Sequence, residues 1–307
     1  MFLDKMKDRI GDFEGKLGIC YIDINSRAGF TAGNCDVFPA SGIIKLLILI
    51  EAFKRLNEGE INKNDTYILK TDDYPKIREK SFSALEHIHI GAELTIEDLY
   101  KLNVIVSDNM AFNILLKLFG KDAVNDTLQE FGFKKTRINR AINDYAEITK
   151  GVQNYVSVQE MANLLLRMYE GQIISNAASK EMLEILCEHQ KTSPLTYNFL
   201  ESMKIAHQSG YDDNEIHDMG IVYGENPFIL CMASSVPNTK NAESVMRDIT
   251  MMCYQNSNKE NPHLRTRWDM AFDLPLAFAR TIWKKKQKQI LYPKPAEFRG
   301  FLIFNSF

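Results

Sequence analysis

Long apolar runs are absent from this 307-residue sequence, because charged residues interrupt the hydrophobic stretches before any could span a membrane. The opening segment, MFLDKMKDR, is charged throughout and has no apolar signal core. The net charge is only −3, which gives no electrostatic footprint for nucleic acid or for strongly acidic substrates. We therefore expect a cytoplasmic protein with no transmembrane segment that binds no nucleic acid.

Cysteine is scarce and shows no pairing pattern. The chain has five cysteines, an odd number, widely spaced and mostly inside apolar runs: Cys20, Cys35, Cys187, Cys231 and Cys253. No two of them have the spacing of metal ligands, so we expect buried free thiols in a reducing compartment. His87 and His89 alternate in an exposed stretch but lack a third ligand. Neither a metal site nor a cofactor is expected.

Hydrophobic periodicity predicts a helix, two strands, a long helical block, three strands and a last helix. Helices are expected over residues 1–13, 42–56 and 242–254, and others begin at the capping residues Thr95 and Ser157. Strands are expected over residues 17–24, after the turn at 25–29, and over 203–206, 216–223 and 228–233. The fold class is therefore α+β: a five-stranded antiparallel sheet flanked by N- and C-terminal helices, an all-helical lobe, and a cleft between the lobes.

Three short motifs follow one another along the chain. The first is FPASGIIK at residues 38–45, at the start of a helix that is apolar nearly all round. The second is SDN at residues 107–109. The third is HQSG at residues 207–210, followed by HDMGIV at residues 217–222.

These motifs resemble the Phe-Pro-x-Ala-Ser-x-x-Lys, Ser-Asp-Asn and Lys-Thr-Gly signatures of class A serine β-lactamases and penicillin-binding proteins. The resemblance covers residues 1–256 and implies the β-lactamase-like fold, with a sheet lobe of residues 1–40 and 201–256 and a helical lobe of residues 41–200. It implies catalytic roles for Lys45 and Ser107. It also implies a ligand pocket formed by Gly42, Asn109, Gln208, Ser209 and Gly210.

The sequence departs from this pattern at three places. Acyl transfer needs a hydroxyl with a nearby base, but Gly42 occupies the position of the reactive serine. Gln208 replaces the lysine of the third motif, which removes a positive charge for a substrate carboxylate. The Glu-x-x-Leu-Asn loop of β-lactamases has no counterpart between residues 136 and 155, where Asp144 and Glu147 are the only carboxylates. We therefore expect a catalytically inactive or strongly impaired member that retains a ligand pocket.

Ser41 leaves an alternative open. It precedes Lys45 by four residues, so an acyl hydrolase of the β-lactamase, esterase or peptidase type could use Ser41 with Lys45. The one-residue shift rotates the side chain by about a third of a turn, away from the expected oxyanion donors. The structural interpretations are an N-cap role for Ser41 and a hydrogen-bonding hub at Lys45 with the Ser107 hydroxyl. A hydrolase that relies on bound water has no visible pair of carboxylates to support it.

Residues 257–307 form a basic C-terminal extension outside the resemblance. They contain ten Lys and Arg and four Asp and Glu, which gives a net charge of +6. The body of the chain, residues 1–256, carries a net charge of −9. Folding back onto the acidic body or pairing in a homodimer is the first interpretation, and contact with an anionic membrane or another partner is the second. The ending FLIF at residues 301–304 would promote aggregation if it were free, which favours docking. In the cleft, the expected partner is a small molecule or a peptide.

Overall fold

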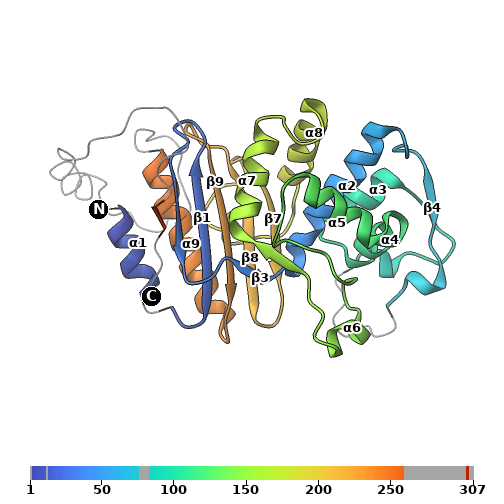
Figure 1. Ribbon diagram of the computed structural model, residues 1–307, viewed down its shortest axis with the longest axis horizontal. Coiled ribbons are helices and arrows are strands. Elements are labelled where there is room, and N and C mark those ends of the chain that lie inside the picture. The colour runs from blue at the N-terminus through green and yellow to red at the C-terminus, as the bar shows by residue number, and fades with distance from the viewer. Residues whose placement is uncertain (1, 12, 76–82, 259–301, 304–307) are drawn as a thin grey trace.

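The computed structural model describes residues 2–11, 13–75, 83–258 and 302–303, and a six-stranded sheet organises them (Figure 1). The strand order is β10-β2-β1-β9-β8-β7. The strands are β1 (Lys16–Asp23), β2 (Gly29–Gly33), β7 (Ile205–Tyr211), β8 (Glu215–Val222), β9 (Phe228–Ser235) and β10 (Leu302–Ile303). The first five are antiparallel, which confirms the predicted sheet. The short β10 pairs parallel to β2, in agreement with the expected docking of this ending.

Helices are concentrated between β2 and β7. They are α2 (Lys45–Glu58), α3 (Ile96–Ile105), α4 (Asn109–Phe119), α5 (Lys121–Glu130), α6 (Tyr145–Thr149), α7 (Val158–Tyr169) and α8 (Asn176–Cys187), with α1 (Phe2–Ile10) and α9 (Thr239–Ser257) at the two ends. The 3-10 turns are η1 (Ser41–Ile44), η2 (Thr71–Asp73) and η3 (Leu85–His87). Two small ladders pair β3 (Val37–Pro39) with β6 (Tyr155–Ser157) and β4 (Thr66–Ile68) with β5 (Glu93–Thr95).

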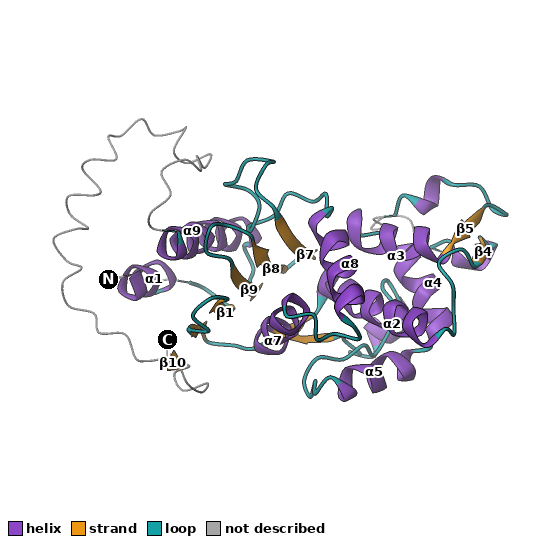
Figure 2. Cartoon of the chain, turned by 90° about the horizontal axis from the view of Figure 1, so that it is seen from above, coloured by secondary structure: helices purple, strands orange, loops and turns teal. Residues whose placement is uncertain are grey.

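The sheet separates two hydrophobic cores. Helices α1 and α9 lie side by side on one face, and α7 with the other helices lies on the opposite face (Figure 2). Strand β1 contributes side chains to both cores. Ile19 and Tyr21 pack in the core beneath α1 and α9. Cys20 and Ile22 pack in the core shared with the helical lobe. Successive strand residues point to opposite faces, so this central strand is apolar on both faces, as the sequence predicts.

Side-chain caps fix where several helices begin. Thr95 accepts a hydrogen bond from the backbone N–H of Asp98, whose carboxylate accepts one from the backbone N–H of Thr95 in return. Ser157 accepts from the backbone N–H of Glu160 at the start of α7. Both predicted helix starts are therefore confirmed. The ends were less predictable: α9 extends three residues beyond the predicted range on each side, and β7 continues to Tyr211, so the third motif lies inside a strand.

All five thiols are free, as predicted, but the prediction that they are buried is wrong for two of them. Cys35 and Cys187 are half-buried because Cys35 lies in the connection between β2 and β3 and Cys187 is the last residue of α8. Burial still raises the pKa of the Cys187 thiol to about 11, which disfavours the reactive thiolate. In the part of the chain that the structure describes, no helix is long and apolar enough to cross a membrane. The same residues hold no group of three or more His, Cys, Asp or Glu placed to bind a metal.

Candidate active site

The beginning of the first motif is anchored to the sheet by His217. Its Nε2 donates to the carbonyl oxygen of Pro39 at 2.7 Å, and its Nδ1 accepts from the backbone N–H of Ser234 at 3.3 Å. These two contacts set the tautomer of a fully buried ring, and burial lowers the pKa of His217. His217 on β8 is thus a structural anchor that holds η1 against the sheet.

Ser41 begins η1 with a left-handed backbone, at a φ of 44°. A capping serine has an extended backbone and accepts a hydrogen bond from the helix, whereas the N-cap position here is Ala40 and no side-chain cap bond is present. The N-cap prediction for Ser41 is therefore wrong, because the chain must turn sharply as it passes from β3 into η1. A non-glycine residue in this conformation is strained, and such strain occurs mostly at functional sites.

Gly42 lies directly against the third motif. A Cβ at Gly42 would come within 2.7 Å of the Ser209 carbonyl oxygen and 3.2 Å of the Gly210 Cα. A Cβ at Gly210 would in turn lie 2.8 Å from the Gly42 nitrogen and 3.2 Å from the Ser41 Oγ. The backbones of η1 and β7 therefore touch through two glycines. The absence of a side chain at Gly42 allows this close approach.

Lys45 is a hydrogen-bonding hub at the start of α2. Its Nζ donates to the Ser107 carbonyl oxygen, to the Ser107 Oγ at 2.7 Å and to the Asn109 Oδ1 at 2.7 Å. Burial of the ammonium, which is 2% exposed, holds the pKa of Lys45 well below its usual value, and the charge of Lys191 lowers this pKa further. The structure thus brings three predicted site residues together. Within the described residues, no hydrogen bond joins Ser41 to Lys45.

Asp108 fixes the loop that carries Ser107 and Asn109. The carboxylate is fully buried and caps α4 by accepting from the backbone N–H of Ala111 at 2.9 Å. It also accepts from the Ser83 hydroxyl at 2.7 Å and from the backbone N–H of Leu85 at 3.1 Å. One side chain therefore positions the second motif and ties a neighbouring loop to it.

In the third motif, the Ser209 hydroxyl donates a hydrogen bond to a histidine side chain of the same chain. His189 Nδ1 lies 2.7 Å from the carbonyl oxygen of Val104, which can only accept, so Nδ1 carries the hydrogen. Nε2 is then an acceptor, and the Ser209 hydroxyl donates to it at 2.9 Å. Gln208 is fully buried: its Nε2 donates to the Ser209 carbonyl oxygen at 3.2 Å, and its Oε1 has no partner among the described residues.

A second histidine stabilises the strand beside this pair. His207 Nδ1 lies 3.0 Å from Asp218 Oδ1, and Asp218 Oδ2 accepts from the backbone N–H of Leu195 at 2.8 Å. The His207 and His189 rings meet edge to face, with centroids 4.6 Å apart. The segment between α8 and β7 is therefore bonded to the edge of the sheet.

The two carboxylates of the loop between residues 136 and 155 are engaged locally. Asp144 caps α6 by accepting from the backbone N–H of Glu147 at 3.2 Å. Glu147 pairs with exposed Lys150 at 2.6 Å. Both carboxylates therefore have partners within their own loop.

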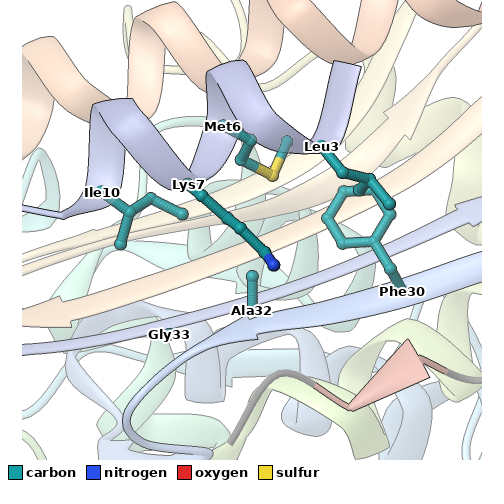
Figure 3. Close-up of a pocket in the computed structure, with 7 residues that line it drawn as sticks. All are labelled: Leu3, Met6, Lys7, Ile10, Phe30, Ala32 and Gly33. Atoms are coloured by element: carbon teal, nitrogen blue, oxygen red, sulfur yellow. The ribbon is translucent and has the colours of Figure 1, made fainter. Parts of the chain in front are cut away.

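Two cavities among the described residues lie away from the predicted site. One is an apolar crevice of about 10 Å³ between α1 and β2, lined by Leu3, Met6, Lys7, Ile10, Phe30, Ala32 and Gly33 (Figure 3). It has room for at most a single water molecule. The other, of about 300 Å³, lies beside α5 and is lined by Asn125, Leu128, Gln129, Phe133, Lys134, Thr136 and Arg137. Neither contains a residue of the three motifs.

Comparison with known proteins identifies the family. Residues 2–257 match Beta-lactamase2, described as the Beta-lactamase enzyme family. The chain belongs to this β-lactamase family. It is similar to β-lactamase CARB-4 of Pseudomonas aeruginosa, with 25% identity over 197 residues that cover 63% of this chain and 67% of the relative.

Two solved structures share the fold of this β-lactamase-family chain. PBP-A has a TM-score of 0.74 at 23% identity, covering 84% of this chain and 96% of its own. The β-lactamase from Sphaerobacter thermophilus DSM 20745 has a TM-score of 0.74 at 22% identity, covering 85% and 98%. The predicted β-lactamase-like fold is therefore confirmed.

Two residues near the motifs of this β-lactamase-family chain were not predicted from the sequence. His189 and Lys191 lie in the connection between α8 and β7, which has neither periodicity nor a motif. A histidine and a lysine two residues apart in this connection are the only signal they give. Their proximity to Ser209 and Lys45 arises from the tertiary fold alone.

Replacing His189 with Gln is expected to weaken the pH dependence of stability. Burial, aided by the charge of His207, lowers the pKa of His189 from 6.5 to about 3. Between these values the unfolded chain binds a proton that the folded chain does not. The free energy of unfolding therefore decreases as the pH falls below about 6.5, by about 2 kcal/mol at pH 5 from this residue.

Urea unfolding of wild type and His189→Gln at pH 7 and pH 5 measures this contribution. The matched control is His87→Gln, which replaces an exposed histidine and should keep the wild-type pH dependence. An equal loss of stability at pH 5 in wild type and His189→Gln would contradict the assignment.

Proposed function

We propose that this chain is a non-acylating member of the β-lactamase family that binds a small molecule or a peptide in its cleft without forming a covalent bond. The observation that carries the proposal is the contact at Gly42. The position has no hydroxyl, and Ser209 and Gly210 occupy the space into which a side chain would project. Without a nucleophile at this place, an acyl-enzyme cannot form.

The surroundings of Gly42 support the same proposal. The Lys45 ammonium donates its three hydrogen bonds to Ser107 and Asn109, so Lys45 acts as a structural link between α2 and the second motif. The Ser209 hydroxyl donates to His189. Gln208 contributes an amide in place of a cation. The groups that would activate a nucleophile or hold a substrate carboxylate are thus engaged elsewhere or replaced.

Incubation with a fluorescent penicillin, followed by intact-mass measurement, tests the proposal. We expect no adduct and no hydrolysis of a chromogenic cephalosporin, under conditions in which a penicillin-binding protein is fully labelled and an active serine β-lactamase hydrolyses the cephalosporin. A stoichiometric adduct on the wild-type chain would overturn the proposal.

The alternative is a serine acyl hydrolase that uses Ser41. The strained backbone at Ser41 favours it, because strain of this kind is typical of functional residues. The absence of a described hydrogen bond between Ser41 and Lys45 speaks against it. Should an adduct appear, Ser41→Ala separates the cases: loss of labelling would assign the nucleophile to Ser41, and unchanged labelling would exclude it.

A further inference from the structure

The cavity of about 300 Å³ beside α5 has walls that are fixed by hydrogen bonds. Asn125, Leu128 and Gln129, which share one face of α5, line it from the helix, and the segment that follows α5 lines it from the other side. The Phe133 N–H donates to the Leu128 carbonyl oxygen at 3.0 Å. Asn125 donates to the Ile138 carbonyl oxygen at 2.7 Å and accepts from the Ile138 N–H at 3.0 Å. Both ends of the segment are therefore tied to the helix, and the cavity is formed before any ligand binds.

The lining combines apolar and charged side chains. Leu128 and Phe133 are buried and provide an apolar floor. Gln129, Lys134 and Arg137 are exposed and form a polar rim. A ligand that enters the cavity would therefore place an apolar part against the floor and a polar part against the rim.

The two cations of the rim have no partner within the part of the chain that the structure describes. Neither the Lys134 ammonium nor the Arg137 guanidinium forms an ion pair or a side-chain hydrogen bond there. Lys135, the residue after Lys134, pairs instead with Asp36 at 2.9 Å. The Glu160 carboxylate accepts from the backbone N–H groups of Lys134 and Lys135, at 2.8 and 3.1 Å. Two cations thus line one cavity without an ion-pair partner among the described side chains, which favours an anionic ligand.

The Thr136 hydroxyl adds a donor to this lining. Its Oγ1 accepts from the Ser157 N–H at 3.0 Å, and the residue is 2% exposed. A hydroxyl can donate as well as accept, yet among the described residues the Thr136 proton has no acceptor. An oxygen of a bound anion would accept it.

We propose that this cavity binds a small aromatic carboxylate, with its ring on Leu128 and Phe133 and its carboxylate between Lys134 and Arg137. The volume is at the lower end of the range of about 300–1,000 Å³ that is usual for ligand pockets, so the ligand is small. A planar guanidinium matches a carboxylate in two parallel hydrogen bonds, and an aromatic ring packs favourably against Phe133. Because no residue of the three motifs lines the cavity, this is a second site, and it is independent of the proposed function.

Titration of the 15N-labelled protein with benzoate tests the proposal by NMR. Benzoate has both the ring and the charge, benzamide lacks the charge, and acetate lacks the ring. We expect saturable shifts of the backbone amides of residues 125–137, and benzoate should bind at least ~10-fold more tightly than either analogue. Arg137→Gln should weaken benzoate binding by about tenfold, and Arg137→Lys should restore only part of the affinity because its ammonium cannot form the paired hydrogen bonds.

Lys134→Met and Lys135→Met form a matched pair of neighbouring lysines. Lys134 lines the cavity, so its loss should weaken benzoate binding several-fold, whereas Lys135 pairs with Asp36 and its loss should leave the affinity unchanged. Wild-type affinity in Arg137→Gln, equal binding of benzoate and benzamide, shifts confined to the three motifs, or no saturable shift up to ~10 mM would each overturn this inference. A covalent penicillin adduct would overturn the proposed function and leave this site untouched.

Discussion

A Gly42→Ser variant is expected to remain unreactive toward penicillin and to lose about 2 kcal/mol of unfolding free energy. The added Cβ would lie 2.7 Å from the Ser209 carbonyl oxygen, a backbone atom that cannot rotate away. Either β7 or η1 must shift, and both are fixed: β7 by its ladder with β8, and η1 by the bond from His217 to Pro39. A hydroxyl at position 42 therefore would not by itself make the site reactive.

Two variants separate the steric effect from the chemistry. Gly42→Ala introduces the same Cβ without the hydroxyl and should be as destabilised as Gly42→Ser. Gly11→Ser is the control for a glycine with more room, because a Cβ at Gly11 meets its nearest atom, the Lys7 carbonyl oxygen, at 3.3 Å. Urea unfolding and intact mass after penicillin treatment supply the measurements. A stable Gly42→Ser variant that acylates would show that β7 moves aside freely, contrary to this expectation.

Much of the fold could be predicted because the relevant signals are local. Strand β1 is apolar on both faces since two cores meet it, and this shows directly in its sequence. The start of α3 is marked by the reciprocal bonds of Thr95 and Asp98, which are only three residues apart. The grouping of Lys45 with Ser107 and Asn109 was implied by the family resemblance, since no local pattern links residues so far apart in the chain.

The features that decide the chemistry were not predictable in this way. The contact of Gly42 with Gly210 joins segments distant in sequence, and a glycine alone does not show what approaches it. The left-handed backbone of Ser41 reflects how η1 is attached to the sheet, whereas a serine before a helix usually indicates a cap. Lys191 is likewise recognisable only once its connection is folded against α3 and β7.

Replacing Asp108 with Ala is expected to lower the free energy of unfolding by about 3 kcal/mol. The loss of a helix cap alone accounts for about 1 kcal/mol. The remainder follows from the Ser83 hydroxyl and the Leu85 N–H, which lose their acceptor at a fully buried site. Asp108 also favours the charged form of Lys45, so its removal leaves a buried ammonium with less compensation.

Asp144→Ala is the matched control, because Asp144 caps α6 through one hydrogen bond, from the Glu147 N–H, and is only half-buried. It should lose about 1 kcal/mol, so urea unfolding of the two variants isolates the buried part of the Asp108 effect. Asp108→Asn should fall between them, since its amide oxygen can still cap α4 while its N–H₂ group faces the Leu85 N–H. Equal losses for Asp108→Ala and Asp144→Ala would mean that the links to Ser83, Leu85 and Lys45 contribute nothing, and that Asp108 is a helix cap alone.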